Sequence, residues 1–240
     1  MSGRDAILRN VRRSLGRGAV PVETAAALSE RVATHRRNLI PARAASLPRA
    51  ARVDLFIKMA EEVQTSVTRV ACDADIPAEV ARYLAAENLP AELAVAPDAS
   101  LADVPWGDRP LLQIRRGKAE PGDAVSLTPC LAAVAETGTL MLVSGSGTPT
   151  TLNFLPDTQI VVVRAGQIVA GYEDGWDLIR ERAANSGEGW PRTVNLITGP
   201  SRTGDIEQRI QLGAHGPRRL HIVVVGDVDG NSADGAPSDA

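Results

Sequence analysis

The strongest constraint on the fold of this 240-residue chain comes from two runs of consecutive apolar residues. They lie in QIVVVR at 159–164 and in LHIVVV at 220–225. Successive side chains of a β-strand point to opposite faces of the sheet, so a strand that is apolar at every position must be covered on both faces. Strands of this kind, alternating with helices, are typical of a largely parallel sheet between helical layers. The sequence therefore predicts an α/β fold with an open, largely parallel sheet flanked by helices.

The rest of the chain supplies the alternation that such a fold needs. Apolar residues at helical spacing predict helices, and short apolar runs bounded by turn residues predict strands. Helices are expected at 52–64, 77–88, 129–135 and 174–184, and further strands at 66–71, 92–96, 111–115, 140–144, 167–171 and 194–198.

The N-terminal segment departs from this pattern. Residues 1–50 carry ten arginines against three acidic residues, although the whole chain has a net charge of −3. A helix with one apolar face is expected here, and that face consists of Ile7, Leu8, Val11 and Leu15. We predict a helical, Arg-rich and partly mobile arm at 1–50, an α/β domain at 51–226 and an acidic disordered tail at 227–240. The arm could dock on an acidic partner or on this protein's own acidic body.

Composition argues against several classes of protein. No apolar run approaches the roughly 20 residues of a membrane-spanning helix, and the N-terminus has no apolar secretory core. The basic arm lacks interleaved aromatic residues in a chain that is acidic overall, which disfavours nucleic-acid binding. We therefore expect a cytoplasmic protein that neither spans a membrane nor binds nucleic acid.

The sequence carries no recognisable cofactor signature. The two cysteines, Cys72 and Cys130, are too few for a four-thiolate iron–sulfur cluster or zinc site, and we expect free thiols. The glycine- and hydroxyl-rich segment GSGTPTT at 145–151 lacks both the G-x-G-x-x-G pattern and the P-loop lysine. It is at most a phosphate-holding loop, and the cofactor remains unknown.

The stretch GPSRTGDIE at 199–207 follows a predicted strand, VNLIT. Its polar residues suit the start of a helix. Ser201 or Thr203 can cap the first turn, and Asp205 with Gln208 can form a reciprocal cap. These interactions explain three polar residues without a ligand.

Gly199 and Arg202 are not explained by a helix start. A guanidinium beside free backbone N–H groups suits a carboxylate or a phosphate. The alternative is that Arg202 pairs with a neighbouring carboxylate such as Asp205 and that the turn is purely structural. His215, in a His-Gly-Pro turn, is expected to contact the ligand or to be structural. A catalytic set with Ser201 is disfavoured, because the segment lacks the G-x-S-x-G nucleophile elbow.

The segment AETGT at 135–139 lies where a predicted helix gives way to a strand. A carboxylate placed there, Glu136, can act as a nucleophile or a general base if it is desolvated. The alternative is an ordinary solvated glutamate beside a glycine turn. Thr137, Gly138 and Thr139 follow Glu136 and join the candidate ligand-binding residues.

These motifs carry a family resemblance. The run GPSRTGDIEQRIQLGAHGPRRLHIVVV, with AETGTLMLV and LNFLPDTQIVVV, strongly resembles the LUD domain family over residues 130–226. The resemblance implies a bacterial-type protein with the fold of the superfamily that contains glucosamine-6-phosphate deaminase, ribose-5-phosphate isomerase and the CoA transferases. It also implies a part in the oxidation of L-lactate to pyruvate, within a three-protein system whose other members carry the iron–sulfur chemistry.

The sequence motifs and the family resemblance together predict a function. Removing two electrons from lactate requires an acceptor, and the sequence has neither a cluster's worth of cysteines nor a dinucleotide fingerprint. We expect a subunit of a lactate-oxidising system that binds a small carboxylate or phosphate and leaves the redox centres to iron–sulfur partner proteins. The candidate ligand-binding residues are Thr137, Gly138, Thr139, Gly199, Ser201, Arg202, Thr203, Asp205 and His215.

Two alternatives stay open. The first is a stand-alone enzyme that acts on a small anion or an acyl-CoA, with Glu136 as the catalytic, acyl-accepting carboxylate. The second is a regulatory or scaffolding module that binds partners through its arm. The sequence does not decide whether the chain forms a homodimer.

Overall fold

The computed structural model describes residues 3–16, 18–37, 41–187, 189–203 and 211–226. Contacts divide the chain into two compact units, residues 1–40 and 41–240. The first unit holds helices α1 (Gly3–Ser14) and α2 (Val22–Thr34), as predicted, and neither helix buries a residue. The arm boundary at residue 50 stays a prediction, and the tail at 227–240 lies outside the described residues.

The second unit is built on a six-stranded sheet in which every neighbouring pair of strands is parallel. The strand order is β1-β12-β7-β4-β2-β3. The strands are β1 (Ser66–Val70), β2 (Glu92–Val95), β3 (Gln113–Arg116), β4 (Val125–Pro129), β7 (Thr158–Arg164) and β12 (Arg219–Val225). The predicted parallel α/β architecture is confirmed.

A second sheet of four strands packs beside the first, and the sequence analysis did not separate the two. Its order is β8-β5-β6-β9, with β8 parallel to β5 and the other pairs antiparallel. The strands are β5 (Ala132–Val134), β6 (Thr139–Val143), β8 (Ile168–Val169) and β9 (Val194–Ile197). The helix predicted at 129–135 is therefore wrong. Its alanines favour a helix locally, but their burial between layers selects a strand.

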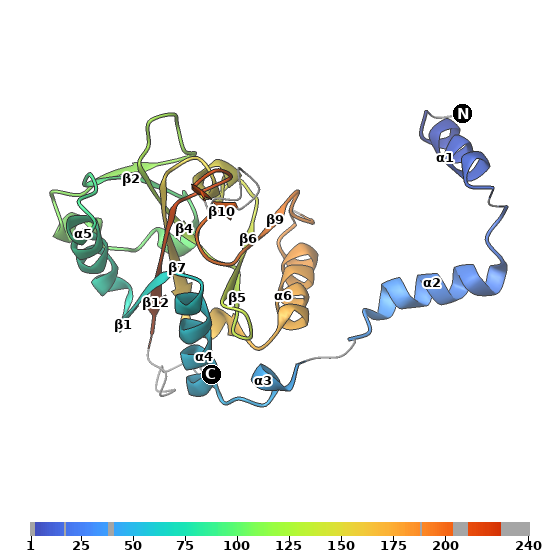
Figure 1. The fold of residues 1–240 in the computed structure, drawn as a ribbon, viewed down its shortest axis with the longest axis horizontal. Helices are drawn as coiled ribbons and strands as arrows, with labels where there is room; N and C mark the ends of the chain where they lie inside the picture. Colours follow the sequence, from blue (N-terminus) through green and yellow to red (C-terminus); the bar gives the residue numbers. More distant parts are fainter. Residues whose placement is uncertain (1–2, 17, 38–40, 188, 204–210, 227–240) are drawn as a thin grey trace, which may run out of the picture. The chain divides into compact units, whose positions relative to one another are not determined.

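Helices complete the unit in layers (Figure 1). They are α3 (Ala42–Ala45), α4 (Arg49–Glu62), α5 (Ile76–Ala86) and α6 (Tyr172–Asn185), with short 3₁₀ turns at Asp73–Asp75, Ala99–Leu101, Trp106–Asp108, Thr150–Asn153 and Ala165–Gln167. Helix α5 covers one face of the large sheet, and α4 lies with the small sheet on the other face. Helix α6 covers the outer face of the small sheet.

The alternation of side chains along β7 shows why its sequence is apolar throughout. Ile160 and Val162 pack in the core under α5, whereas Val161 and Val163 pack in the core shared with α4 and the small sheet. Both faces of the strand are thus removed from water, as the sequence predicted. Within the described residues, no helix is both long enough and apolar enough to cross a bilayer.

Candidate functional site

The AETGT segment forms the turn of the hairpin between β5 and β6. Gly138 has a φ of +67°, and a Cβ there would lie 2.5 Å from the backbone nitrogen of Ala60 in α4. Only glycine fits this combination of left-handed backbone and close packing. Gly138 therefore positions the hairpin against α4. A role in ligand binding stays a prediction for this residue.

The GPSR segment follows β9 and approaches the same end of α4. Gly199 has a φ of +77°, and a Cβ there would lie 2.7 Å from the carbonyl oxygen of Val63, the residue that ends α4. The prediction that Ser201 or Thr203 starts a helix is wrong for these residues, because Arg202 and Thr203 form strand β10. This short strand pairs with β11 (Gln211–Leu212) in an antiparallel ribbon. The proposed cap by Asp205 lies outside the described residues.

Four hydroxyl groups join the two turns. Oγ1 of Thr139 lies 2.7 Å from Oγ1 of Thr137, 2.7 Å from Oγ1 of Thr198 and 2.9 Å from the phenol oxygen of Tyr172. The Thr137 hydroxyl also donates to Tyr172 over 3.1 Å. Thr139 is fully buried and Thr198 is exposed. This hydroxyl network therefore runs from the interior to the surface at the end of the small sheet.

A pocket of about 240 Å³ opens beside this network, and we call it the signature pocket. It brings together four predicted residues: Gly199, Ser201, Arg202 and His215. The other lining residues are Asn153, Phe154, Gln159, Leu196, Ile197, Thr198, Pro200, Gly216, Pro217 and Leu220. Arg202 and His215 are exposed at its rim, so the pocket presents basic groups that suit an anion.

Ser201 holds the two turns of the signature pocket together. Its hydroxyl oxygen accepts a hydrogen bond from the backbone N–H of His215 over 3.2 Å. Its own N–H donates to the carbonyl of Pro217 over 2.8 Å, and its carbonyl accepts from Gly213 over 2.9 Å. These bonds give Ser201 a structural role in shaping the pocket.

The Arg202 guanidinium donates to Oε1 of Gln64 over 3.3 Å at the surface.

Two buried amides in the pocket lining were not predicted from the sequence. The Gln159 side chain donates from Nε2 to Oδ1 of Asn153 over 2.9 Å and to Oγ1 of Thr128 over 3.2 Å. Oε1 of Gln159 is buried and has no hydrogen-bond partner among the described residues. A buried acceptor of this kind favours a ligand that can donate a hydrogen bond. The sequence feature that could have revealed this amide is a polar residue, Gln159, at the start of the otherwise apolar run IVVV.

Glu136 lies apart from the signature pocket. Only 7% of its surface is exposed, and its Oε2 has no hydrogen-bond partner among the described residues. The carboxylate lies within 4 Å of the Cβ position of Gly171, which caps the start of α6. A carboxylate at a helix start is stabilised by the free N–H groups there. Arg43 donates to the Glu136 backbone carbonyl. The catalytic role expected of Glu136 remains a prediction.

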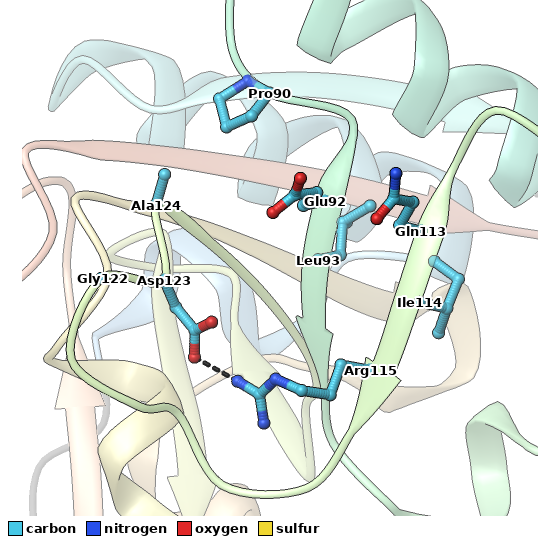
Figure 2. A pocket seen from close by; sticks show the side chains of 9 residues that line it. All are labelled: Pro90, Glu92, Leu93, Gln113, Ile114, Arg115, Gly122, Asp123 and Ala124. Carbon is cyan, nitrogen blue, oxygen red and sulfur yellow. Dashed lines mark hydrogen bonds and ion pairs between the residues drawn. The ribbon is translucent and has the colours of Figure 1, made fainter.

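A further hollow of about 300 Å³ lies where β2 and β4 diverge (Figure 2). The two strands pair only through Ala94 and Val95 at the end of β2, which lie opposite Ser126 and Leu127 near the start of β4. Arg115 forms an ion pair with Asp123 and a longer one, of 4.0 Å, with Glu120, and Glu92 lines the same hollow. The guanidinium is therefore neutralised by carboxylates, and none of the predicted residues lies here. The signature pocket is the better candidate site.

His221 in β12 is a buried, packed histidine. Its ring stacks on Tyr83 with centroids 4.0 Å apart. Nδ1 lies 2.8 Å from the Ser66 hydroxyl, and Nε2 lies 3.2 Å from Oε1 of Glu79. Burial lowers the pKa of His221 to about 4, although the nearby Glu79 carboxylate opposes this shift. The imidazole is therefore neutral near pH 7.

The described residues include no group of three or more histidine, cysteine, aspartate or glutamate side chains placed to hold a metal ion. Cys72 is exposed and Cys130 is buried, and both are free thiols. Burial raises the pKa of Cys130 to about 12. The donor set therefore does not fit a four-thiolate cluster on this chain.

The fold and site define an α/β protein in which a parallel six-stranded sheet, joined by a small mixed sheet, carries a pocket with a basic rim. The sequence pattern of the LUD domain family matches residues 53–225. The chain therefore belongs to the LUD domain family.

Curated relatives share part of this chain. The chain is 43% identical over 105 residues to lactate utilization protein C of Deinococcus radiodurans, covering 43% of this chain and 47% of the relative. It is 36% identical over 110 residues to lactate utilization protein C of Bacillus subtilis, covering 46% of this chain and 45% of the relative. The matched segment thus spans less than half the length of these relatives.

A solved structure resembles a larger part of the chain. It is the crystal structure of a DUF162 family protein from Deinococcus radiodurans, which is 27% identical with a TM-score of 0.57. The alignment covers 75% of this chain and 99% of that one. The likeness supports the α/β fold described above.

Proposed function

We propose that this chain takes part in lactate utilization, as a cytoplasmic subunit that supports the oxidation of L-lactate to pyruvate. Iron–sulfur partner proteins carry the redox centres in this proposal. The observation that carries it is the similarity to relatives named lactate utilization protein C, within a family match over residues 53–225. The chemistry of the signature pocket and of the two cysteines supports it further.

The signature pocket suits a small 2-hydroxy acid. The exposed Arg202 guanidinium can bind a carboxylate through two parallel hydrogen bonds. The buried amide of Gln159 offers an unused acceptor, Oε1, which a ligand hydroxyl would satisfy. A pocket of about 240 Å³ admits a three-carbon acid. This combination is the chemical support for lactate as the ligand.

The thiols of this chain support placing the redox centres on partners. Oxidation of lactate to pyruvate releases two electrons and two protons, so an electron acceptor is required. A thiolate is the form that ligates iron. Cys130, with its pKa raised to about 12 by burial, stays protonated near pH 7, and Cys72 lies exposed on another part of the fold. Two such thiols do not make a four-thiolate cluster.

Growth on lactate tests the cellular role. A strain that lacks this chain should fail to grow on L-lactate and grow normally on pyruvate, and the wild-type chain should restore growth. Affinity purification from lactate-grown cells should recover cysteine-rich iron–sulfur proteins with the tagged chain. Normal growth of the deletion strain on L-lactate would sink the proposal. A chain lacking residues 1–40 tests whether the arm, rather than the second unit, recruits the partners.

Binding tests the pocket separately from the cellular role. L-Lactate should bind the purified chain, and Arg202→Gln should weaken that binding about tenfold through loss of a charged hydrogen-bonded pair. Arg69→Gln is the matched control, because Arg69 is also exposed but pairs with Asp54 away from the pocket. Equal L-lactate affinities of the wild-type chain and the Arg202→Gln variant would show that Arg202 does not bind the ligand.

A further inference from the structure

Strand β9 forms one edge of the small sheet, and within the described residues no strand pairs with its outer side. The backbone N–H of Ser144, just after β6, donates to the carbonyl of Thr193 over 2.9 Å, so the backbone of Thr193 faces β6. Backbone groups alternate in direction along an antiparallel strand. Asn195 therefore also bonds toward β6, whereas Val194 and Leu196 direct their N–H and C=O groups outward.

The other edges of the two larger sheets are protected against pairing. Edge strand β1 carries Arg69, and edge strand β3 carries Arg115 and Arg116. Edge strand β8 has only two residues, and its Ile168 carbonyl accepts a hydrogen bond from Arg52 over 3.4 Å. Charged side chains, very short strands and covering groups all discourage edge-to-edge pairing. The four residues of β9, VNLI, are all uncharged, so this edge is open to another strand.

Two side chains of β9 also fit a missing neighbour. Leu196 is 48% exposed. Nδ2 of Asn195 is buried and has no hydrogen-bond partner among the described residues. Buried amide donors are normally paired with an acceptor. A strand added along β9 would cover the leucine and bring an acceptor to the amide.

We propose that β9 pairs with β9 of a second copy of this chain, antiparallel and around a two-fold axis at Asn195. A two-fold interface of this kind is self-complementary, because the same surface serves both copies. Val194 then lies opposite Leu196 of the second copy, and the two residues exchange backbone hydrogen bonds. The two-fold axis repeats this pair, and the two four-stranded sheets become one continuous sheet.

This register accounts for both side chains. The two Asn195 residues lie directly opposite each other as a non-hydrogen-bonded pair, with Cα atoms about 4.5 Å apart. The amide of one can donate to the carbonyl oxygen of the other. Leu196 lies on the same face of the sheet as Val194, which packs in the core under α6. Leu196 of one copy therefore meets Val194 of the other as an apolar cross-strand pair.

The pairing also bears on the signature pocket. Leu196 belongs to the lining of that pocket, so the strand of the second copy would lie along one of its walls. The proposal does not depend on lactate as the ligand.

Light scattering after size-exclusion chromatography tests the association of the full chain. At submillimolar concentration the wild-type chain should have twice the mass of one chain. Leu196→Lys should halve the measured mass, because a lysine on an edge strand opposes pairing. Leu111→Lys is the matched control and should stay dimeric, because Leu111 is 85% exposed and precedes β3 in the large sheet. Circular dichroism checks that each variant is folded.

A disulfide tests the register. The background is Cys72→Ser, which leaves only the buried Cys130 as a native thiol. Asn195→Cys should form a disulfide-linked dimer on mild oxidation, because Cα atoms about 4.5 Å apart lie within disulfide range. Thr193→Cys is the control and should not cross-link. In the proposed register the two Thr193 residues are separated by about 13 Å along the strands, which is too far for a disulfide.

Several results would overturn the proposal. A monomeric wild-type chain at submillimolar concentration would reject a second copy as the occupant of this edge. A folded Leu196→Lys variant that stays dimeric, or an Asn195→Cys variant that does not cross-link, would place the interface elsewhere. Cross-linking of Thr193→Cys as efficient as that of Asn195→Cys would reject the register on which the proposal is built.

Discussion

The hydroxyl oxygens of Thr139 and Thr198 lie 2.7 Å apart, although 59 residues separate them in the chain. Antiparallel pairing of β6 and β9 brings them together, because Leu140 lies opposite Ile197 at the same end of the ladder. This contact ties the AETGT turn to Thr198, the residue that precedes the GPSR segment and lines the signature pocket. The signature pocket therefore depends on the small sheet, which the sequence pattern did not resolve.

Thr139→Val should destabilise the second unit by about 1–3 kcal/mol. Valine keeps the shape of threonine but removes the hydroxyl that contacts Thr137, Thr198 and Tyr172. The free energy of unfolding in urea is the measurement. Thr193→Val is the control, because Thr193 is exposed and should change the free energy by less than about 0.5 kcal/mol. Equal effects of both substitutions would contradict the importance of the network.

Gly138→Ala should be more damaging than its size suggests. The added Cβ would meet the Ala60 nitrogen at 2.5 Å, and the backbone φ is +67°. Overpacking and the left-handed backbone together should cost about 2–5 kcal/mol. Gly187→Ala isolates the backbone effect, since Gly187 has a φ of +71° with nothing within 4 Å of its Cβ position. A denaturation midpoint shifted equally by both variants would disprove the close packing of the hairpin on α4.

The main sheet was predictable because its signal is local. Ile160 and Val161 face different cores, so an apolar residue is needed at each position, and the sequence displays that need directly. The segment around Ala132 and Ala133 misled the prediction, because alanine has no strand preference of its own. Only burial between two layers decides its conformation.

The candidate site was predictable in part. Arg202 and His215 stood out as polar residues without a local explanation, and the structure places both on the signature pocket. Asn153 and Gln159 were missed, because a buried amide is recognisable only once its surroundings are known. Thr198 was missed for the same reason. Its partner Thr139 is remote in sequence.

The two cysteines should differ sharply in reactivity. Cys72 is exposed, whereas Cys130 is buried and its pKa is raised to about 12 by burial. Iodoacetamide acts on thiolates, so the native chain near pH 8 should gain one adduct by mass spectrometry. In denaturant the same chain should gain two adducts. Cys72→Ser should abolish labelling of the native protein. Fast native labelling of Cys130 would show that this core is open.

His221 should make folding stability fall as the solution becomes acidic. Burial lowers its pKa from 6.5 to about 4, against the opposing effect of Glu79. Below pH 6.5 the unfolded chain gains a proton at His221 that the folded chain does not, so unfolding becomes easier. The effect should develop between pH 6.5 and 4 and reach about 3 kcal/mol.

Urea denaturation at a series of pH values measures this dependence. His221→Gln should flatten the fall between pH 6.5 and 4.5, because it removes the buried imidazole. Glu79 acts in a lower range. Burial raises the pKa of its carboxyl, but the hydrogen bonds from Arg82 and Thr68 and the charge of Arg82 outweigh burial and lower it. Glu79 therefore stabilises the folded chain above pH 4.5, the ordinary pKa of a glutamate carboxyl, and this stabilisation is lost only as the pH falls below that value. An unchanged slope above pH 4.5 in His221→Gln would show that other groups cause the acid sensitivity.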